Sequence, residues 1–396
     1  MDTKALGEFY KDKLLNEVEP FWFPRSLDTV NGGLYHCCAA DGTLVDTDKN
    51  VWAQGRMAWM LLTCYNSIEK RPEWMQYAES ALKFLEEKCV DPSDGRMYFH
   101  MTADGTPIRK RRYAYSECFA AIAWAAHYGA TGDTHSAERA RHWFDIYAHI
   151  NFTPGTTAPK STGNRPGENL GCRMIMIVTA QELRRYLGDA DGFYTGWIDR
   201  CIDDLQRLFL HEDIQAVLEN VAPDGSVIDH FDERVLNPGH DIEGGWFVLE
   251  EARYRGGDKK LIEIGCKMID WALARGWDKK YGGLLYYTDV YNKPVQEYWH
   301  NMKFWWPHDE ALIGTCLAYV MTGDEKYAEW HQRIHDWAFE HLQDKEHGEW
   351  FGYCNQDGTT TNGLKGSMWK SFFHHPRALW CCAHYFGAIP APETKA

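Results

Sequence analysis

The chain has 396 residues and a formal net charge of −15, and it contains 18 Trp, 21 Tyr and 18 Phe. Such an excess of negative charge argues against a nucleic acid or an anionic membrane as a partner, although it allows a locally basic pocket. So many aromatic side chains either fill a large core or line a pocket for a ring-shaped ligand.

Cysteine usage and the apolar runs indicate the cellular compartment. The 12 cysteines include the adjacent pairs Cys37-Cys38 and Cys381-Cys382, but no Cys-x-x-Cys spacing for zinc and no regular disulfide framework. Residues 1–20 contain no apolar signal-peptide core, and the longest apolar run, Ala311 to Met321, is too short to span a bilayer. We therefore expect a cytoplasmic protein.

Helical patterns cover most of the chain and alternate between two kinds, which we expect outside and inside the fold respectively. The polar segments with one apolar stripe are residues 4–18, 72–88, 135–149, 196–210, 259–275 and 325–341. The more apolar segments between them are Val51 to Tyr65, Tyr115 to Tyr128, Leu170 to Tyr186, His240 to Tyr254, Pro307 to Met321 and His374 to Phe386. Strict alternation of outer and inner helices predicts an (α/α)6 barrel.

An internal repeat supports this arrangement. Segments that open at Gly257-Asp258-Lys259 and Gly323-Asp324-Glu325 stay in step at an offset of about 66 residues, so that Asp270-Trp271-Ala272 matches Asp336-Trp337-Ala338. An open solenoid would use the same units, but its terminal repeats would be visibly more polar. No linker or low-complexity segment interrupts the chain, so we expect one domain over residues 1–396.

Glycine-rich turns precede several of the inner segments and predict short β-hairpins at one end of the barrel. They are Asn31-Gly32-Gly33, Asp224-Gly225, Gly282-Gly283 and Asp357-Gly358.

Reactive side chains gather at the starts of the inner segments. In Asn237-Pro238-Gly239-His240, turn chemistry leads into a helix that places His240 and Glu243 on one face. A single motif of this kind is more often a histidine that merely caps a helix. Here the arrangement recurs, because other inner segments begin with Arg56, with Trp305, His308 and Glu310, and with His374 and Arg377.

These residue types suit acid–base chemistry on a sugar. Two histidines can transfer protons near neutral pH, arginine stabilises an oxyanion, and Glu beside a tryptophan such as Trp305 suits the hydroxyls and apolar face of a sugar ring.

The competing interpretation is a metal site built from His308, Glu310, His374 and His375. No His-Glu-x-x-His spacing supports it, so we expect no metal. No nucleotide-binding glycine loop and no Gly-x-Ser-x-Gly is present.

At these residues the sequence resembles the N-acylglucosamine 2-epimerase family, whose relatives include cellobiose 2-epimerases and aldose–ketose isomerases. The resemblance covers nearly the whole chain and is carried by Asn237-Pro238-Gly239-His240…Glu243 and by Phe373-His374…Pro376-Arg377. The segment Glu219-Asn220-Val221-Ala222-Pro223-Asp224-Gly225-Ser226 is most similar to the N-acetylglucosamine branch.

The resemblance implies an (α/α)6 barrel, a homodimer, and two essential histidines at His240 and His374. It implies that Arg56, Glu243, His308, Glu310 and Arg377 hold the substrate or stabilise the intermediate. It also implies ATP as an allosteric activator that is not consumed. The corresponding loop, residues 153–166, keeps Lys160 and Arg165-Pro166 but lacks a clear phosphate-binding pattern. We therefore expect no cofactor in the chemistry and leave activation by ATP open.

The function expected from these residues is interconversion of N-acetylglucosamine and N-acetylmannosamine. The enzyme would open the ring, with one histidine and Glu243 or Glu310 moving the proton between O1 and O5. A neutral histidine would remove the C2 proton, Arg56 would stabilise the cis-enediolate, and the second histidine would return a proton on the opposite face. We assign His374 as the base for one epimer and His240 for the other.

Three alternatives remain open. One is a 2-epimerase or aldose–ketose isomerase for unsubstituted sugars such as mannose or cellobiose. Another is a glycoside hydrolase, which needs two carboxylates that flank the scissile bond. The third is a binding protein without catalysis, since members of the family that the sequence resembles bind protein partners.

Overall fold

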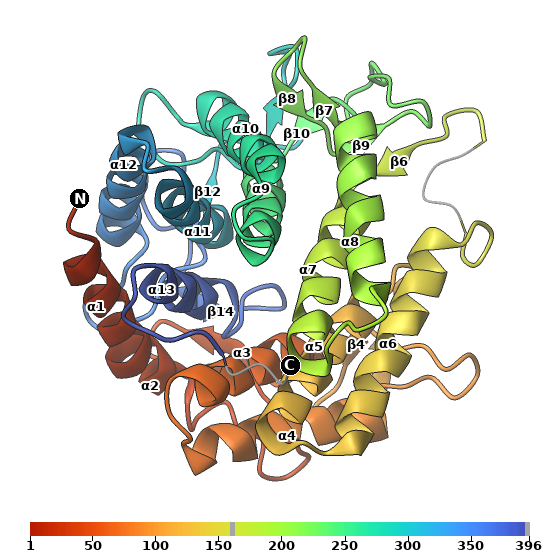
Figure 1. The fold of residues 1–396 in the computed structure, drawn as a ribbon. Helices are drawn as coiled ribbons and strands as arrows, with labels where there is room; N and C mark the ends of the chain where they lie inside the picture. The colour runs from red at the N-terminus through yellow and green to blue at the C-terminus, as the bar shows by residue number, and fades with distance from the viewer. Residues whose placement is uncertain (159–162, 393–396) are drawn as a thin grey trace.

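A computed structural model describes residues 1–158 and 163–392, and its helices form a closed ring in two layers (Figure 1). The inner helices are α3 (Val51–Ser67), α5 (Tyr115–Thr131), α7 (Leu170–Leu187), α9 (Pro238–Tyr254), α11 (Trp305–Thr322) and α13 (His374–Tyr385). Each packs on the next, and α13 also contacts α3, so the inner ring is closed. The predicted (α/α)6 barrel is therefore confirmed.

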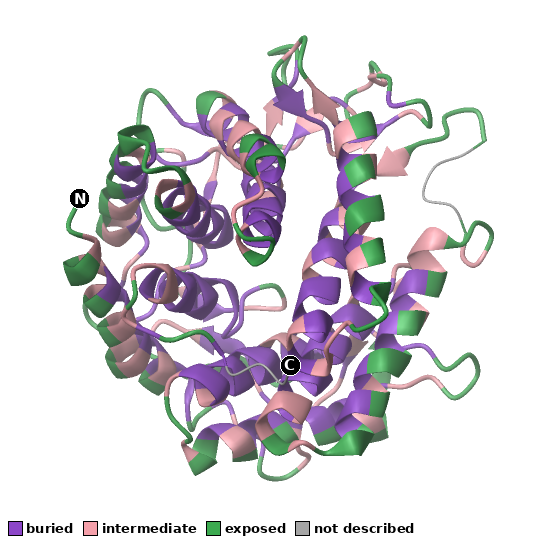
Figure 2. Ribbon diagram, viewed as in Figure 1, coloured by how far each residue is buried: buried purple, intermediate pink, exposed green. Residues whose placement is uncertain are grey.

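The outer layer begins with α1 (Thr3–Lys13), which continues through the π-helical turn η1 (Leu14–Val18) into α2 (Glu19–Trp22). The other outer helices are α4 (Pro72–Lys88), α6 (Thr134–Phe152), α8 (Phe193–Asp204) with the π-helical turn η2 (Leu205–Phe209), α10 (Lys259–Gly276) and α12 (Glu325–His341). Figure 2 shows inner helices that are buried on most sides and outer helices that expose one face, as the hydrophobic patterns predict.

Asparagine caps fix where several inner helices begin. Asn50, Asn169 and Asn237 each accept a hydrogen bond from a backbone N–H in the first turn of α3, α7 and α9. These caps satisfy donors that a helix start leaves free. They also place the helix starts, and the residues that follow them, at one end of the barrel.

Short antiparallel strands cover that end and confirm the predicted hairpins. The strands form two three-stranded sheets and several two-stranded ones in the described part of the chain. One three-stranded sheet contains β14 (Leu364–Gly366), β1 (Cys37–Ala39) and β2 (Leu44–Asp46). The other contains β3 (Lys49–Asn50), β4 (His100–Met101) and β5 (Pro107–Arg109). The pairs are β6 (Glu168–Asn169) with β9 (Asn220–Val221), β7 (Leu210–His211) with β8 (Ala216–Val217), β10 (Val235–Leu236) with β11 (Thr288–Asp289), and β12 (Lys303–Phe304) with β13 (Tyr353–Cys354).

The internal repeat corresponds to a repeated buried ion pair that anchors these hairpins. Lys303 lies 2.9 Å from Asp278, and Lys365 lies 3.0 Å from Asp344. In each pair the ammonium group also donates to a glycine carbonyl of the hairpin. Lys49 and Asp28, 2.7 Å apart, repeat the arrangement near the N-terminus. The hairpins are therefore fixed to the barrel and give the site a rigid frame.

In the described ranges, no helix combines the length and the apolar character needed to cross a lipid bilayer.

Candidate active site

A cavity of about 700 Å³ lies inside the inner ring. Its wall is rich in tryptophan and tyrosine, and it includes residues from the first turns of inner helices on both sides of the ring. The predicted site residues that line the cavity are Arg56, His240, Glu243, Trp305, His374 and Arg377. Glu310 is fully buried directly behind this wall, in contact with His374. His308 is the one predicted site residue that the structure does not bring into this group.

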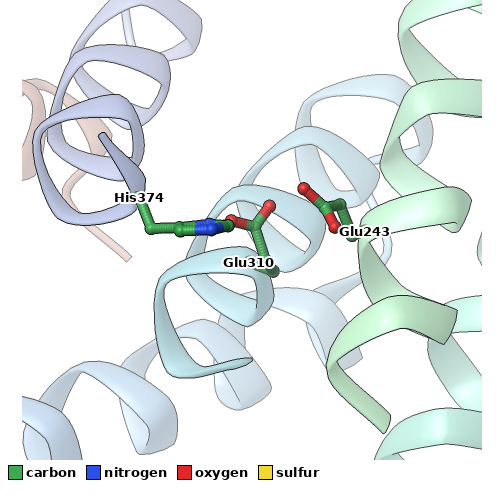
Figure 3. A group of neighbouring side chains, drawn as sticks. All are labelled: Glu243, Glu310 and His374. Atoms are coloured by element: carbon green, nitrogen blue, oxygen red, sulfur yellow. The ribbon is translucent and has the colours of Figure 1, made fainter. Parts of the chain in front are cut away.

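His374 belongs to a buried network that spans three inner helices. Figure 3 shows His374, Glu310 and Glu243 approaching one another from α13, α11 and α9. One Glu310 oxygen lies 2.7 Å from Nδ1 of His374, and Nη2 of Arg377 donates to Glu310 and to Glu243, each at 2.6 Å. The other Glu310 oxygen accepts a 2.8 Å hydrogen bond from Nε1 of Trp246. The network therefore fixes the orientation of the His374 ring.

The network also sets the protonation of His374. An ionised carboxylate only accepts hydrogen bonds, so Nδ1 of His374 carries a proton and Nε2 of the neutral ring has the free lone pair. Burial, together with the positive charges of Arg377 and Arg56, holds the pKa of His374 well below its ordinary value. His374 is consequently a neutral imidazole at pH 7, which is the form that can accept a proton.

His240 has the opposite electrostatic environment. Its Nδ1 lies 2.9 Å from a carboxylate oxygen of Glu219, and its side chain is 36% exposed, against 10% for His374. Burial disfavours the charged ring, but the negative charge of Glu219, helped by Glu243 and Glu310, outweighs this and raises the pKa of His240. The two pKa values are therefore shifted in opposite directions, that of His374 toward the neutral ring and that of His240 toward the protonated ring.

Trp306 lies between the two histidines. Its ring centroid is 5.0 Å from that of His240 and 5.8 Å from that of His374. Gly239, which precedes His240, makes this packing possible, because a Cβ at that position would lie 2.5 Å from a ring carbon of Trp306. One indole thus packs against both imidazoles.

Arg56 contributes a positive charge to the cavity, and no carboxylate of the described residues forms an ion pair with it. Its guanidinium stacks on Phe119 at 4.2 Å, on Phe373 at 4.6 Å and on Trp52 at 5.7 Å. Its Nε is buried without a hydrogen-bond partner, and burial lowers its pKa to about 10. A cation held in this way is suited to stabilise negative charge that develops on a ligand.

His308 has a structural role instead of the predicted substrate contact. It is fully buried, with Nδ1 2.7 Å from the carbonyl of Phe304 and Nε2 accepting a 2.9 Å hydrogen bond from the backbone N–H of Leu284. Burial lowers its pKa to about 3, and the ring stacks on Trp337 at 4.5 Å. Both nitrogens are used to hold a hairpin against α11, so His308 is not part of the cavity wall.

The residues do not fit a metal ion. Of the four predicted ligands, His308 and His375 hydrogen-bond elsewhere, the latter to Asp309 at 2.9 Å. Ligand atoms of Glu243, Glu310 and His374 do lie within 4.8 Å of one another. Arg377, however, already donates to both carboxylates and supplies the positive charge that a cation would bring.

Glu219 is a residue of this site that the sequence analysis does not predict. It lies 21 residues before His240 and reaches it because β9, which starts at the next residue, pairs with β6. Glu219 opens the Glu-Asn-Val-Ala-Pro-Asp-Gly-Ser segment, which was the available signal.

Comparisons with known proteins show which family and which fold the chain resembles. A family model described as N-acylglucosamine 2-epimerase (GlcNAc 2-epimerase) matches residues 33–378. The chain is 34% identical over 391 residues to N-acylglucosamine 2-epimerase of Mus musculus, covering 96% of this chain and 92% of that protein. The structure of cellobiose 2-epimerase from Bacillus thermoamylovorans superposes with a TM-score of 0.82 at 22% identity, covering 96% of this chain and 99% of that one. A D-mannose isomerase structure superposes with a TM-score of 0.81 at 17% identity, covering 96% and 98%.

Proposed function

We propose that this chain, which belongs to the N-acylglucosamine 2-epimerase family, interconverts N-acetylglucosamine and N-acetylmannosamine without a redox cofactor or metal. Membership of the family makes it a sugar epimerase. The observation that carries the finer proposal is that two imidazoles, each hydrogen-bonded to a carboxylate, contact the same indole in one cavity. The pairs are His374 with Glu310 and His240 with Glu219, and the indole is that of Trp306.

The reaction begins with ring opening, because the C2 hydrogen of the sugar is acidic only when C1 is a free carbonyl. In the proposed mechanism His240 or His374, supported by its carboxylate, moves the proton between O5 and O1. Trp305 and Trp306 provide apolar faces against which the sugar packs. Glu243 and Arg377 offer polar groups for its hydroxyls.

Proton removal at C2 then falls to His374. Its neutral ring takes the C2 proton through Nε2, and the electrons of the C–H bond move into the C1–C2 bond to give a cis-enediolate. Arg56, which no carboxylate in the described residues neutralises, stabilises the negative charge on the enediolate oxygens.

Reprotonation by His240 on the opposite face inverts C2. The raised pKa of His240 supports this role, because its ring keeps a proton to a higher pH than an ordinary histidine does. In the reverse direction the roles exchange, and His240 acts as the base. The difference between the two environments is our reason for assigning one histidine to each epimer.

The choice of N-acetylated sugars rests on the relatives. The mammalian relative that shares 34% of its residues is named for N-acylglucosamine, whereas a cellobiose 2-epimerase of Dictyoglomus turgidum shares 24%. The alternative is a 2-epimerase or aldose–ketose isomerase for unsubstituted sugars such as mannose or cellobiose.

A proton-NMR time course tests this choice directly. N-acetylmannosamine, mannose and cellobiose are offered separately at the same concentration, and the C2 epimer and any ketose are followed. We expect N-acetylglucosamine to form fastest from N-acetylmannosamine. Faster turnover of mannose or cellobiose would favour the alternative.

Two other functions are less well supported by the site. A glycoside hydrolase needs a free carboxylic acid, whereas Glu243 and Glu310 are both bound by Arg377. A binding protein has no need of two histidines whose pKa values are shifted in opposite directions. Release of reducing sugar from a disaccharide, or absence of any turnover, would revive these alternatives.

We further propose that ATP is not required for the chemistry. Of the loop residues considered above, Lys160 lies outside the described residues and Arg165 is exposed. Epimerisation by nucleotide-free protein tests this, and a rise in rate on adding ATP would assign an allosteric role to the nucleotide.

The remaining expectations are carried forward as proposals. Closure of the ring between α3 and α13 supports one catalytic domain over residues 1–396. The unpaired state of all twelve cysteines supports a cytoplasmic location, and the family resemblance supports a homodimer. Limited proteolysis, cell fractionation and light scattering test these three points.

A further inference from the structure

Two of the arginines in the cavity wall have no negative partner. The wall contains Arg56, Arg111, Arg185 and Arg377. Arg377 is neutralised by Glu243 and Glu310 at 2.6 Å, and Arg185 by Glu182 at 3.2 Å and Glu250 at 3.6 Å. Within residues 1–158 and 163–392, neither Arg56 nor Arg111 forms an ion pair with a carboxylate.

Aromatic rings hold Arg111 in place. Its guanidinium lies 4.1 Å from the ring centroid of Phe99, 5.2 Å from Trp369 and 5.7 Å from Trp52. Arg111 donates one hydrogen bond to the hydroxyl of Tyr113, and its Nε is buried without a partner. Stacking fixes the plane of a guanidinium but uses none of the N–H donors at its edge. Arg111 is therefore rigid and still has hydrogen bonds to give.

The guanidinium groups of Arg56 and Arg111 both lie near the indole of Trp52. Each guanidinium lies 5.7 Å from the ring centroid of Trp52, the second residue of α3. The start of α5 follows Arg111 by four residues. Free N–H groups and partial positive charge at helix starts add to the two cations. Two cations therefore lie near one another on the cavity wall, although the chain carries a net charge of −15.

Cations without a negative partner in a partly desolvated site are unfavourable unless a bound anion balances their charge. Arginine forms strong, directional hydrogen bonds with phosphate and carboxylate oxygens. We propose that Arg111 forms a subsite for a phosphate or carboxylate oxyanion in the cavity, to which Arg56, 5.7 Å from the same indole, adds positive charge. The anion is either a free oxyanion or a substituent of the sugar remote from C2, and the second source rests on the function proposed above.

Binding of inorganic phosphate tests the subsite. Titration into the intact protein is followed by calorimetry and by tryptophan fluorescence, because Trp52 and Trp369 both contact Arg111. We expect saturable binding that Arg111→Gln weakens by about tenfold or more, as loss of a charge-assisted hydrogen bond implies. Arg109→Gln is the matched control, since it removes the same charge from an exposed residue of β5 outside the cavity wall.

Three results would overturn the proposal: no saturable phosphate binding by the unaltered protein, equal weakening by Arg109→Gln, or full binding by Arg111→Gln. If Arg111→Gln fails to fold, Arg111→Lys is tested instead, because it keeps the positive charge but loses the planar guanidinium group. Arg111→Lys is expected to bind phosphate more weakly than the unaltered protein, and unchanged binding would count against the subsite.

The source of the oxyanion is separated by a second titration with N-acetylmannosamine 6-phosphate. If the subsite serves a sugar substituent, the sugar phosphate binds more tightly than inorganic phosphate and competes with it. If the subsite serves a free oxyanion, phosphate and neutral N-acetylmannosamine bind together. Both results support the subsite. Binding is measured without turnover, so a failed epimerase assay would leave this test intact.

Discussion

A single methyl group added at Gly239 should disturb both proposed catalytic histidines. An ideal Cβ at this position would lie 2.5 and 2.7 Å from two ring carbons of Trp306 and 3.0 Å from Cβ of Pro307. Carbon atoms normally approach to roughly 3.5–4.0 Å, so the indole or the start of α9 must move by about 1 Å. Overpacking of this kind costs about 1–3 kcal/mol of stability.

The effect on activity should exceed the effect on stability, because Trp306 contacts the rings of both His240 and His374. Misplacement of a reacting group by about 1 Å can lower a rate by roughly 100-fold. We expect Gly239→Ala to fold, to melt at a lower temperature and to lose about 10–100-fold in kcat. Circular dichroism and the NMR epimerase assay measure the two effects.

Gly244→Ala is the matched control in the same helix. Its added Cβ meets the terminal methyl of Met268 at 3.0 Å, and that flexible side chain can move away. Alanine also favours a helix by about 1 kcal/mol over glycine. We expect nearly unchanged kcat. If Gly239→Ala kept kcat within about twofold of the Gly244→Ala value, Trp306 would not position the histidines.

Four further predictions address the roles of individual groups. His374→Asn should lower kcat by roughly 10²–10⁴-fold with little loss of stability, because Asn can still donate a hydrogen bond to Glu310; substantial activity would move the base elsewhere. In the direction in which His374 is the base, kcat/KM should fall at low pH below the ordinary histidine value of 6.5, as His374 becomes protonated, and at high pH above it, as His240 loses its proton. Glu219→Gln removes the main contribution that raises the pKa of His240, so the alkaline limb should move to lower pH; an unmoved limb would refute the assignment. Trp246→Phe deletes the 2.8 Å hydrogen bond to Glu310 and should lower kcat about tenfold, whereas a change in KM alone would contradict its positioning role.

Local signals in the sequence are sufficient for most of the fold. The segment predicted at 72–88 is observed as Pro72–Lys88, and Asn237-Pro238 marks the start of α9 because asparagine caps the helix and proline needs no N–H donor in its first turn. The same rule explains a small error. The inner helix expected from Pro307 begins at Trp305, since proline is tolerated throughout the first turn.

The site could be predicted only in part, because its pairings are not local. Residues at the helix starts converge on the cavity, as the ring topology requires, but the partner of each histidine depends on strand register and helix rotation. Glu219 reaches His240 only through the pairing of β9 with β6. His308 has the residue type of a ligand, yet α11 turns it toward the backbone of Leu284. No sequence pattern distinguishes His308 from His374.

Exchange of the C2 hydrogen with solvent tests the central claim most directly. N-acetylmannosamine is converted in deuterated water, and the C2 hydrogen of the product is followed by proton NMR. If His374 removes a proton and His240 returns one, each N-acetylglucosamine formed should carry deuterium at C2. Inversion with complete retention of the original hydrogen would contradict a mechanism with two exchangeable imidazoles.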